Sequence, residues 1–336
     1  MLRDRAWKLH VVAYMGAALT LAGCDNRSVT SPSATASESR IAGDPAPSGA
    51  RGRCDCWSSK APMLTARYGL GVAAIDGVLY AVGGSRIGVP GGRLAIVEAY
   101  DPATDTGTTK ASMPTARFGL GVAAIDGVLY AVGGVSNTDD LLATVEAYDP
   151  ATDTWTTKAA MPTARLGLGV AVVKGILYAV GGSDRLLPLA TVEAYDPATD
   201  TWTAKMSMPT ARMNLGVTAA GKIVYGVGGY DGFDFLATVE AYDPGTDTWI
   251  TRAPMPTARW LLTAGTLRGI IYAVGGQAPS LIATVEAYDP TTDTWATKAP
   301  MPTARLYLAS GAISPNLYAV GGIKGETAAT VEAYRP

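Results

Sequence analysis

A repeat of nearly constant length runs through most of this 336-residue chain and constrains its fold more than any other feature. The string Thr-Ala-Arg recurs at steps of 50, 48, 47, 47 and 46 residues, and each copy is followed by a Gly-Gly pair and a Val-Glu-Ala-Tyr string. Its arginines are Arg67, Arg117, Arg165, Arg212, Arg259 and Arg305. A fixed period of this size is the signature of repeat architectures, in which each unit is one supersecondary element stacked on its neighbours.

Each unit contains four segments that predict β-strands, which in the second unit are residues 119–125, 128–132, 143–148 and 154–158. Asp126-Gly127 favours a tight hairpin, because type I′ turns need positive φ at their central residues. The first two strands are apolar nearly throughout, which indicates burial on both faces. Four-stranded sheets that pack face to face around an axis meet this need, as in an all-β propeller.

Three spaced motifs resemble the kelch repeat: the Gly-Gly pair after a strand, the later Tyr-Asp-Pro, and a tryptophan seven residues after that tyrosine. The resemblance covers residues 57–336. It implies one six-bladed kelch β-propeller, which we place at residues 55–336.

The two ends of the repeat region predict how the ring of blades closes. The last unit stops at Tyr334-Arg-Pro and lacks the Asp-Thr-Trp strand, whereas Trp57 lies 10 residues before Arg67, as Trp155 lies 10 residues before Arg165. We therefore expect residues 56–61 to be the fourth strand of the last blade, which removes exposed sheet edges.

Two units depart from the pattern. Gly107 stands where other units have tryptophan, so the outer wedge of the first blade should be underpacked. The fifth unit begins its first strand with Trp260-Leu-Leu-Thr-Ala-Gly, without the usual glycine pattern, so the pore lining there should differ.

The start of the chain predicts export and lipidation. Three basic residues precede an apolar segment, residues 9–22, as in a secretory signal. Leu21-Ala22-Gly23-Cys24 resembles the bacterial lipobox, whose cysteine is acylated; the alternative is an ordinary signal in which Cys24 is incidental. We expect a signal peptide at residues 1–23, lipidation at Cys24, and a lipid-anchored protein on the periplasmic or cell-surface side of a bacterial envelope.

We expect residues 24–54 to comprise the lipidated cysteine and a flexible tether, since residues 25–53 are rich in Ser, Ala, Pro and Gly. An exported chain can form disulfides. The single residue between Cys54 and Cys56 makes a mutual disulfide strained, and unpaired thiols or an intermolecular bridge are the alternatives. We expect a monomer.

Composition excludes several function classes. The formal net charge of −2 gives no basic field for nucleic acid. The single histidine, His10, lies in the signal, which excludes Ser-His-Asp catalysis and histidine-dependent metal sites in the mature domain. The repeated aspartate pairs, such as Asp149 with Asp153, are spaced as turns rather than as a calcium loop. We expect no catalytic residue, no metal and no cofactor.

The candidate ligand site is the face formed by the loops between blades, which carry the repeat arginines. Guanidinium groups bind carboxylates in bidentate fashion, and the resemblance to some kelch adaptor proteins implies contact with acidic peptides. The candidate residues are the six arginines with Tyr68, Phe118, Trp260, Tyr230, Phe233 and Phe235. Two alternatives stand beside this site: the arginines pair with the six repeat glutamates, and the aromatic side chains pack between blades.

These features predict a membrane-anchored, extracytoplasmic module that binds a protein, peptide or glycan through its arginine-bearing face. One alternative is an enzyme acting on acidic sugars, which would resemble periplasmic sialic acid mutarotases and use an arginine on the carboxylate with a second carboxylate as acid or base. The other is a surface spacer without a specific ligand. A binding module needs exposed aromatic side chains, and an enzyme needs a non-repeated polar cluster.

Overall fold

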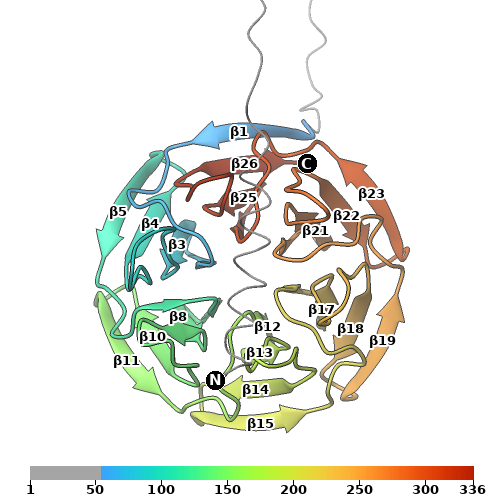
Figure 1. Ribbon diagram of the computed structural model, residues 1–336, viewed down its shortest axis with the longest axis horizontal. Coiled ribbons are helices and arrows are strands. Elements are labelled where there is room, and N and C mark those ends of the chain that lie inside the picture. The colour runs from blue at the N-terminus through green and yellow to red at the C-terminus, as the bar shows by residue number, and fades with distance from the viewer. Residues whose placement is uncertain (1–53) are drawn as a thin grey trace, which may run out of the picture. The chain divides into compact units, whose positions relative to one another are not determined.

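Six four-stranded antiparallel sheets surround one axis in the computed structural model, which describes residues 54–336 (Figure 1). Each sheet is one blade of a β-propeller, as the repeat predicts. The expected signal peptide, the lipidation at Cys24 and the tether at residues 25–53 lie outside the described residues.

The strands follow one another from the axis to the rim in each blade. Blade one contains β2 (Gly71–Ile75), β3 (Val78–Val82), β4 (Val97–Asp101) and β5 (Thr106–Lys110). Blade two contains β7 (Gly121–Ile125), β8 (Val128–Val132), β10 (Val145–Asp149) and β11 (Thr154–Lys158), and a short sheet of β6 (Arg117–Phe118) with β9 (Val135–Ser136) lies beside it. Blade three contains β12 (Gly169–Val173), β13 (Ile176–Val180), β14 (Val192–Asp196) and β15 (Thr201–Lys205).

The remaining blades repeat this order. Blade four contains β16 (Gly216–Ala220), β17 (Ile223–Val227), β18 (Val239–Asp243) and β19 (Thr248–Arg252). Blade five contains β20 (Thr263–Leu267), β21 (Ile270–Val274), β22 (Val285–Asp289) and β23 (Thr294–Lys298). Blade six contains β24 (Ala309–Ile313), β25 (Asn316–Val320), β26 (Val331–Arg335) and β1 (Cys56–Lys60).

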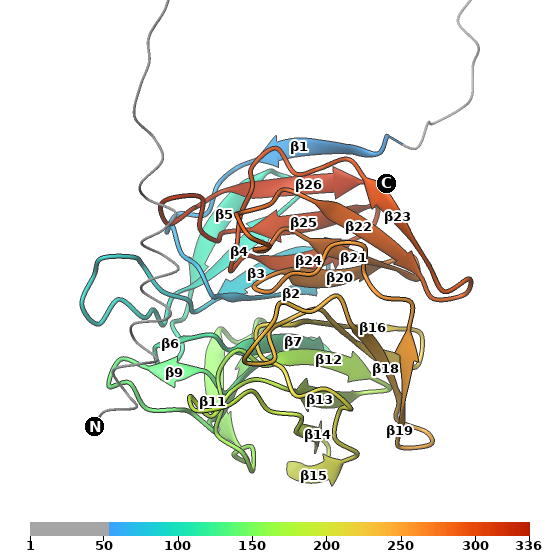
Figure 2. The ribbon, with the colours of Figure 1, turned by 45° about the vertical axis from the view of Figure 1, so that its right-hand side comes forward.

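The predicted closure of the ring is confirmed. Strand β1 pairs antiparallel with β26, with Trp57 opposite Tyr334, so the two ends of the propeller share one sheet (Figure 2). The Trp57 indole Nε1 donates a hydrogen bond of 2.9 Å to the carbonyl oxygen of Ala299, which joins blade six to the segment that follows blade five. Strand β1 therefore covers the edge that β26 would otherwise expose, and blade six has four strands like the other blades.

Aromatic side chains fill the widening space between neighbouring blades. Tyr148 packs against Trp155 in its own blade and against Tyr80 in blade one, with ring centroids 5.2 and 6.1 Å away. The Trp155 indole also donates to the carbonyl oxygen of Ala111, between blades one and two. Each tryptophan thus fastens a rim strand to the blade before it.

The expected underpacking at Gly107 is confirmed. A small cavity lies beside Gly107 and is lined by Ala61, Pro62 and Tyr100 among others. Tyr100 is 8% exposed, whereas its equivalent Tyr148 is fully buried. Without an indole at this position, the rim strand β5 covers its tyrosine less completely.

Candidate functional site

The six repeat arginines lie inside the blades. Each is fully buried, and each forms an ion pair with the repeat glutamate of its own blade, as in the 2.9 Å contact between Arg165 Nη2 and Glu193 Oε2. The pairs are Arg67–Glu98, Arg117–Glu146, Arg165–Glu193, Arg212–Glu240, Arg259–Glu286 and Arg305–Glu332. The prediction that these arginines present their charge to a ligand is therefore wrong, because the folded chain has already paired and enclosed them.

Arg117 shows what the arginines do instead. Its backbone N–H donates to Leu94 and its carbonyl accepts from Gly84, both in blade one. Its guanidinium enters blade two, where Nη1 donates to the carbonyl of Thr144 at 2.9 Å and Nη2 pairs with Glu146. One residue thus ties two adjacent blades together, as the arginine–glutamate alternative expects.

Burial lowers the pKa of Arg165 to about 10, while the Glu193 carboxylate partly opposes this effect. The guanidinium therefore stays charged at neutral pH, and the Glu193 carboxylate stabilises this buried charge.

A closed ring of backbone hydrogen bonds surrounds the axial mouth on the side where the blades are joined. The six residues that form it each lie two positions after a repeat arginine and have φ between 51° and 66°: Gly69, Gly119, Gly167, Asn214, Leu261 and Tyr307. The N–H of each donates to the carbonyl of its equivalent in the preceding blade, over 2.8–3.0 Å. This inter-blade role of Gly119 explains why β7 begins at Gly121 rather than at the predicted residue 119.

The mouth is uneven because only half of this ring carries side chains. Glycine supplies the left-handed conformation in blades one to three at no steric cost. Leu261 and Tyr307 adopt it at a cost of about 1–3 kcal/mol each. The surrounding blades must therefore hold these two residues in place.

Three aromatic rings from blades one, two and six meet at the mouth. Tyr68, Phe118 and Tyr307 are half-buried, and their ring centroids are 5.1–5.7 Å apart. A Cβ on Gly69 would lie 2.0 Å from the Phe118 ring, so the glycine makes room for this cluster. Burial raises the pKa of the Tyr307 phenol well above its ordinary value. Sequence reasoning selected Tyr68 and Phe118 but missed Tyr307, whose signal is a large residue where three other units have glycine.

A second aromatic group lies on blades four and five. The rings of Phe235 and Trp260 are stacked with centroids 5.5 Å apart, and Tyr230 lies 5.2 Å from Trp260. Trp260 is buried, as the packing alternative expects, and Tyr230 and Phe235 are half-buried. Phe233, on the same loop, is 88% exposed.

Exposed apolar side chains continue onto the neighbouring loop of blade three. Leu186 and Leu187 are 65% and 66% exposed, and Gly232 lies against Pro188, so the loops of blades three and four touch. We call Leu186, Leu187 and Phe233 the apolar crest. The crest and both aromatic groups belong to the loops on one side of the propeller.

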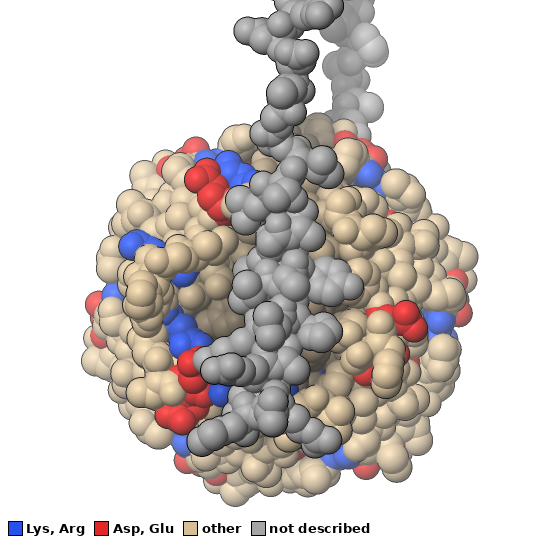
Figure 3. Space-filling model, viewed as in Figure 1, with Lys and Arg blue, Asp and Glu red and all other residues tan. Residues whose placement is uncertain are grey.

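Polar contacts join the loops of blades one and two on this side. Arg93 forms an ion pair with Asp139, and its backbone N–H donates to the Asn137 side chain at 3.1 Å. Charged groups of both signs are scattered between uncharged areas on the face in Figure 3. This mixture gives the visible surface no single sign of charge.

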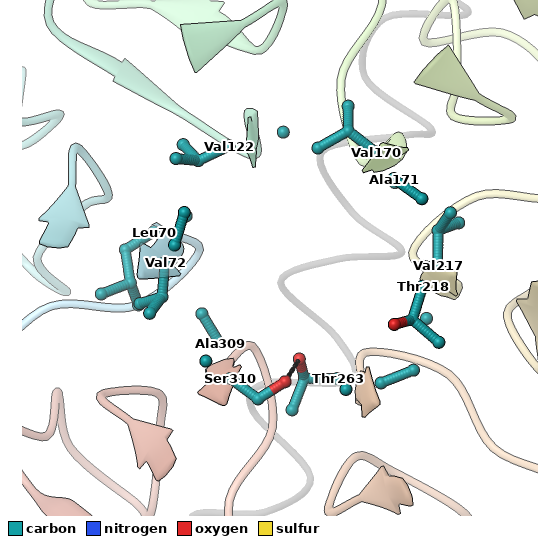
Figure 4. A pocket seen from close by; sticks show the side chains of 18 of the residues that line it. Leu70, Val72, Val122, Val170, Ala171, Val217, Thr218, Thr263, Ala309 and Ser310 are labelled. Atoms are coloured by element: carbon teal, nitrogen blue, oxygen red, sulfur yellow. Dashed lines mark hydrogen bonds between the residues drawn. The ribbon is translucent and has the colours of Figure 1, made fainter. Parts of the chain in front are cut away.

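The axial channel encloses about 460 Å³ and is lined mainly by glycine, alanine, leucine and valine. A Cβ on Gly121 would collide with Val170 of the next blade, so small and branched residues interlock around the axis. In blades five and six, Thr263 and Ser310 replace such a pair and share a hydrogen bond of 2.8 Å (Figure 4). The predicted change of lining at blade five is confirmed.

Of the described residues that line the channel, Tyr307 alone carries a titratable side chain. Within residues 54–336 no group of three or more histidine, cysteine or acidic residues is placed to hold a metal ion. The same part of the chain contains no helix long and apolar enough to cross a membrane.

Comparison with known families identifies the repeat. A family model described as the Kelch motif matches residues 66–114, 116–162, 164–209, 211–256 and 261–302. A comparison with curated proteins found no match.

Proposed function

Since this chain belongs to the kelch-motif family, we propose that it is a protein-interaction module whose partner docks on the face formed by the loops between the second and third strands of each blade. One observation carries this proposal. These loops differ most between the otherwise similar units, and they hold five of the eight large apolar side chains that are exposed in the described residues: Ile87, Val89, Leu186, Leu187 and Phe233. Exposed apolar groups gathered on one face are typical of binding surfaces.

A protein or peptide with apolar side chains is the partner that this surface fits best. Phe233 and the two leucines of the apolar crest supply apolar area, and the aromatic groups around Trp260 and Tyr307 give it a rigid base. The acidic-sugar enzyme considered above needs an arginine that can meet the substrate carboxylate. The repeat arginines are instead paired with glutamates, so we favour the binding module.

We also propose that the module acts outside the cytoplasm and is held to a membrane through a lipid on Cys24. The motif Leu21-Ala22-Gly23-Cys24 supports this part of the proposal. Replacing Cys24 by serine should move the protein from the membrane fraction to the soluble fraction. Retention of the Cys24→Ser protein in membranes would argue against the lipid anchor.

Peptide and glycan arrays probed with residues 54–336 test the binding face. Peptide hits should weaken at least tenfold in Phe233→Ala, because truncating a central aromatic contact of a binding surface costs about 2 kcal/mol or more. Ile250→Ala is the matched control, since Ile250 is 55% exposed but lies on the rim strand β19. Equal binding by both variants would contradict the proposed face, and glycan hits without peptide hits would contradict the proposed partner.

A further inference from the structure

Cys54 and Cys56 form one disulfide at the junction where β1 begins. Both residues are disulfide-bonded, and the chain has only three cysteines, so the two must be bonded to each other. This answers the question that the sequence left open. The equivalent positions of the other five blades show why a disulfide fits across a single intervening residue.

Each of the other blades brings two threonine hydroxyls together at the equivalent positions. Thr152 and Thr154 flank Asp153, and their Oγ1 atoms lie 2.8 Å apart in a hydrogen bond. The same 2.8 Å bond joins Thr104 to Thr106, Thr199 to Thr201, Thr246 to Thr248 and Thr292 to Thr294. The turn therefore places side chains i and i+2 in contact in each of these five blades. Blade six has cysteine sulfur atoms at the two positions where the other blades have threonine hydroxyl groups.

Asp55, the residue between the two cysteines, accepts hydrogen bonds that close the ring. Asp55 has φ of 38° and accepts hydrogen bonds from the Tyr334 hydroxyl and from the backbone N–H of Ala299. Asp153 accepts the same two kinds of bond from Tyr148 and Ala111. In blade six these bonds join the first described residues to the last blade.

Blade six differs from the other blades because no turn joins its third and fourth strands. In blade two a continuous turn joins β10 to β11, and Asp153 is held by that turn. In blade six β26 and β1 come from opposite ends of the described chain, so no such turn orients Asp55. A disulfide across Asp55 supplies the constraint that the missing turn cannot.

We propose that the Cys54–Cys56 disulfide is a redox-sensitive clasp that holds Asp55 in place and so locks the propeller ring. A dithiol reductant opens it: the Cys54–Cys56 bond breaks, the two sulfurs gain two electrons and two protons, and the reductant becomes a disulfide. Cys54 is exposed, so an attacking thiolate can reach the bond. This inference stands independently of the proposed binding function.

Hydrogen exchange of residues 54–336 with and without a dithiol reductant tests the clasp. Reduction should speed exchange in β1, Cys56–Lys60, by roughly tenfold, because local opening requires only release of this strand. Strand β15, Thr201–Lys205, is the equivalent rim strand of blade three, so it is the internal control and should not change. Alkylation and mass analysis before reduction should find both cysteines protected.

The repeat itself supplies the matched variant. Cys54→Thr with Cys56→Thr restores the Thr-Asp-Thr sequence of the other blades, so the double variant should fold and its exchange should not respond to reductant. Equal exchange of oxidised and reduced protein in β1 would overturn the proposal. The same holds if the threonine variant responds to reductant as the parent does, or if the cysteines are alkylated without reduction.

Discussion

At the scale of single residues, the arginine–glutamate pairs show how a repeated motif can be structural. Arg165 and Glu193 are both buried, and each neutralises a charge that would be costly alone. A sequence shows that arginine recurs, but it does not show whether the side chain turns outward or into its own blade. That direction depends on the path of the inter-blade segment, which long-range bonds such as that from Gly84 to Arg117 determine.

Removing one partner of a buried pair should be strongly destabilising. Glu193→Gln leaves the Arg165 cation without its counter-charge, and we expect the free energy of unfolding in urea to fall by about 3–5 kcal/mol. Arg93→Gln breaks the partly exposed pair with Asp139 and should cost less than about 1 kcal/mol. Similar losses in the two variants would contradict this account of the pairs.

Gly107 allows a test by adding a side chain, because the five other blades have tryptophan at the equivalent position. Gly107→Trp should fill the cavity beside Tyr100 and donate to the Ala61 carbonyl, as Trp155 donates to Ala111. Burial of part of the indole should add about 1–3 kcal/mol to the free energy of unfolding. Gly107→Ala separates this gain from the backbone effect of removing glycine. A tryptophan variant no more stable than the alanine variant would show that the wedge cannot accept the ring.

At the scale of elements, each blade holds its third and fourth strands with a tyrosine–aspartate bond. The Tyr148 hydroxyl donates to Asp153 at 2.6 Å, and this bond lowers the pKa of Asp153. Tyr334 lowers the pKa of Asp55 in the same way across the ring closure. Each strand pair therefore depends on an ionised aspartate.

Acid should weaken these bonds together. All six aspartates that accept a tyrosine hydroxyl have a lowered pKa: Asp55, Asp105, Asp153, Asp200, Asp247 and Asp293. Because the unfolded chain binds protons more tightly, with a pKa of about 3.9, their stabilisation is complete above that value and is lost as pH falls through the folded values. The free energy of unfolding should be level from about pH 7 to pH 5 and fall below about pH 4. A level profile down to pH 2 would contradict this role.

Strands were the most predictable elements, and the loops were the least. The 128–132 and 154–158 segments match β8 and β11, because hairpin turns and apolar runs are local signals. The hydrogen-bonded ring at the mouth was not predicted, because its partners, such as Gly69 and Tyr307, come from opposite ends of the chain. The sequence identified the aromatic candidates Tyr68 and Phe118, whereas the position of Tyr307 beside them follows only from the hydrogen-bonded ring.

At the scale of the whole molecule, closure by β1 makes six similar blades into one ring. A chain that starts at Ala61 lacks β1 and leaves β26 as an open edge, which invites pairing with other molecules. We expect a lower unfolding temperature and concentration-dependent aggregation by light scattering, compared with a chain that starts at Cys54. An unchanged unfolding temperature would show that five complete blades support the sixth without its rim strand.

The hydrogen bond from Tyr334 to Asp55 also sets a timetable for synthesis, because its partners are 279 residues apart. Strand β1 leaves the ribosome before any other strand of residues 54–336 and finds its partner only after the last blade has been made. At about 5–20 residues per second, this interval is on the order of 15 to 55 s. Among the described strands, the first to emerge therefore remains unpaired until the last has been made, and during that time the surroundings of the nascent chain must keep β1 from pairing elsewhere.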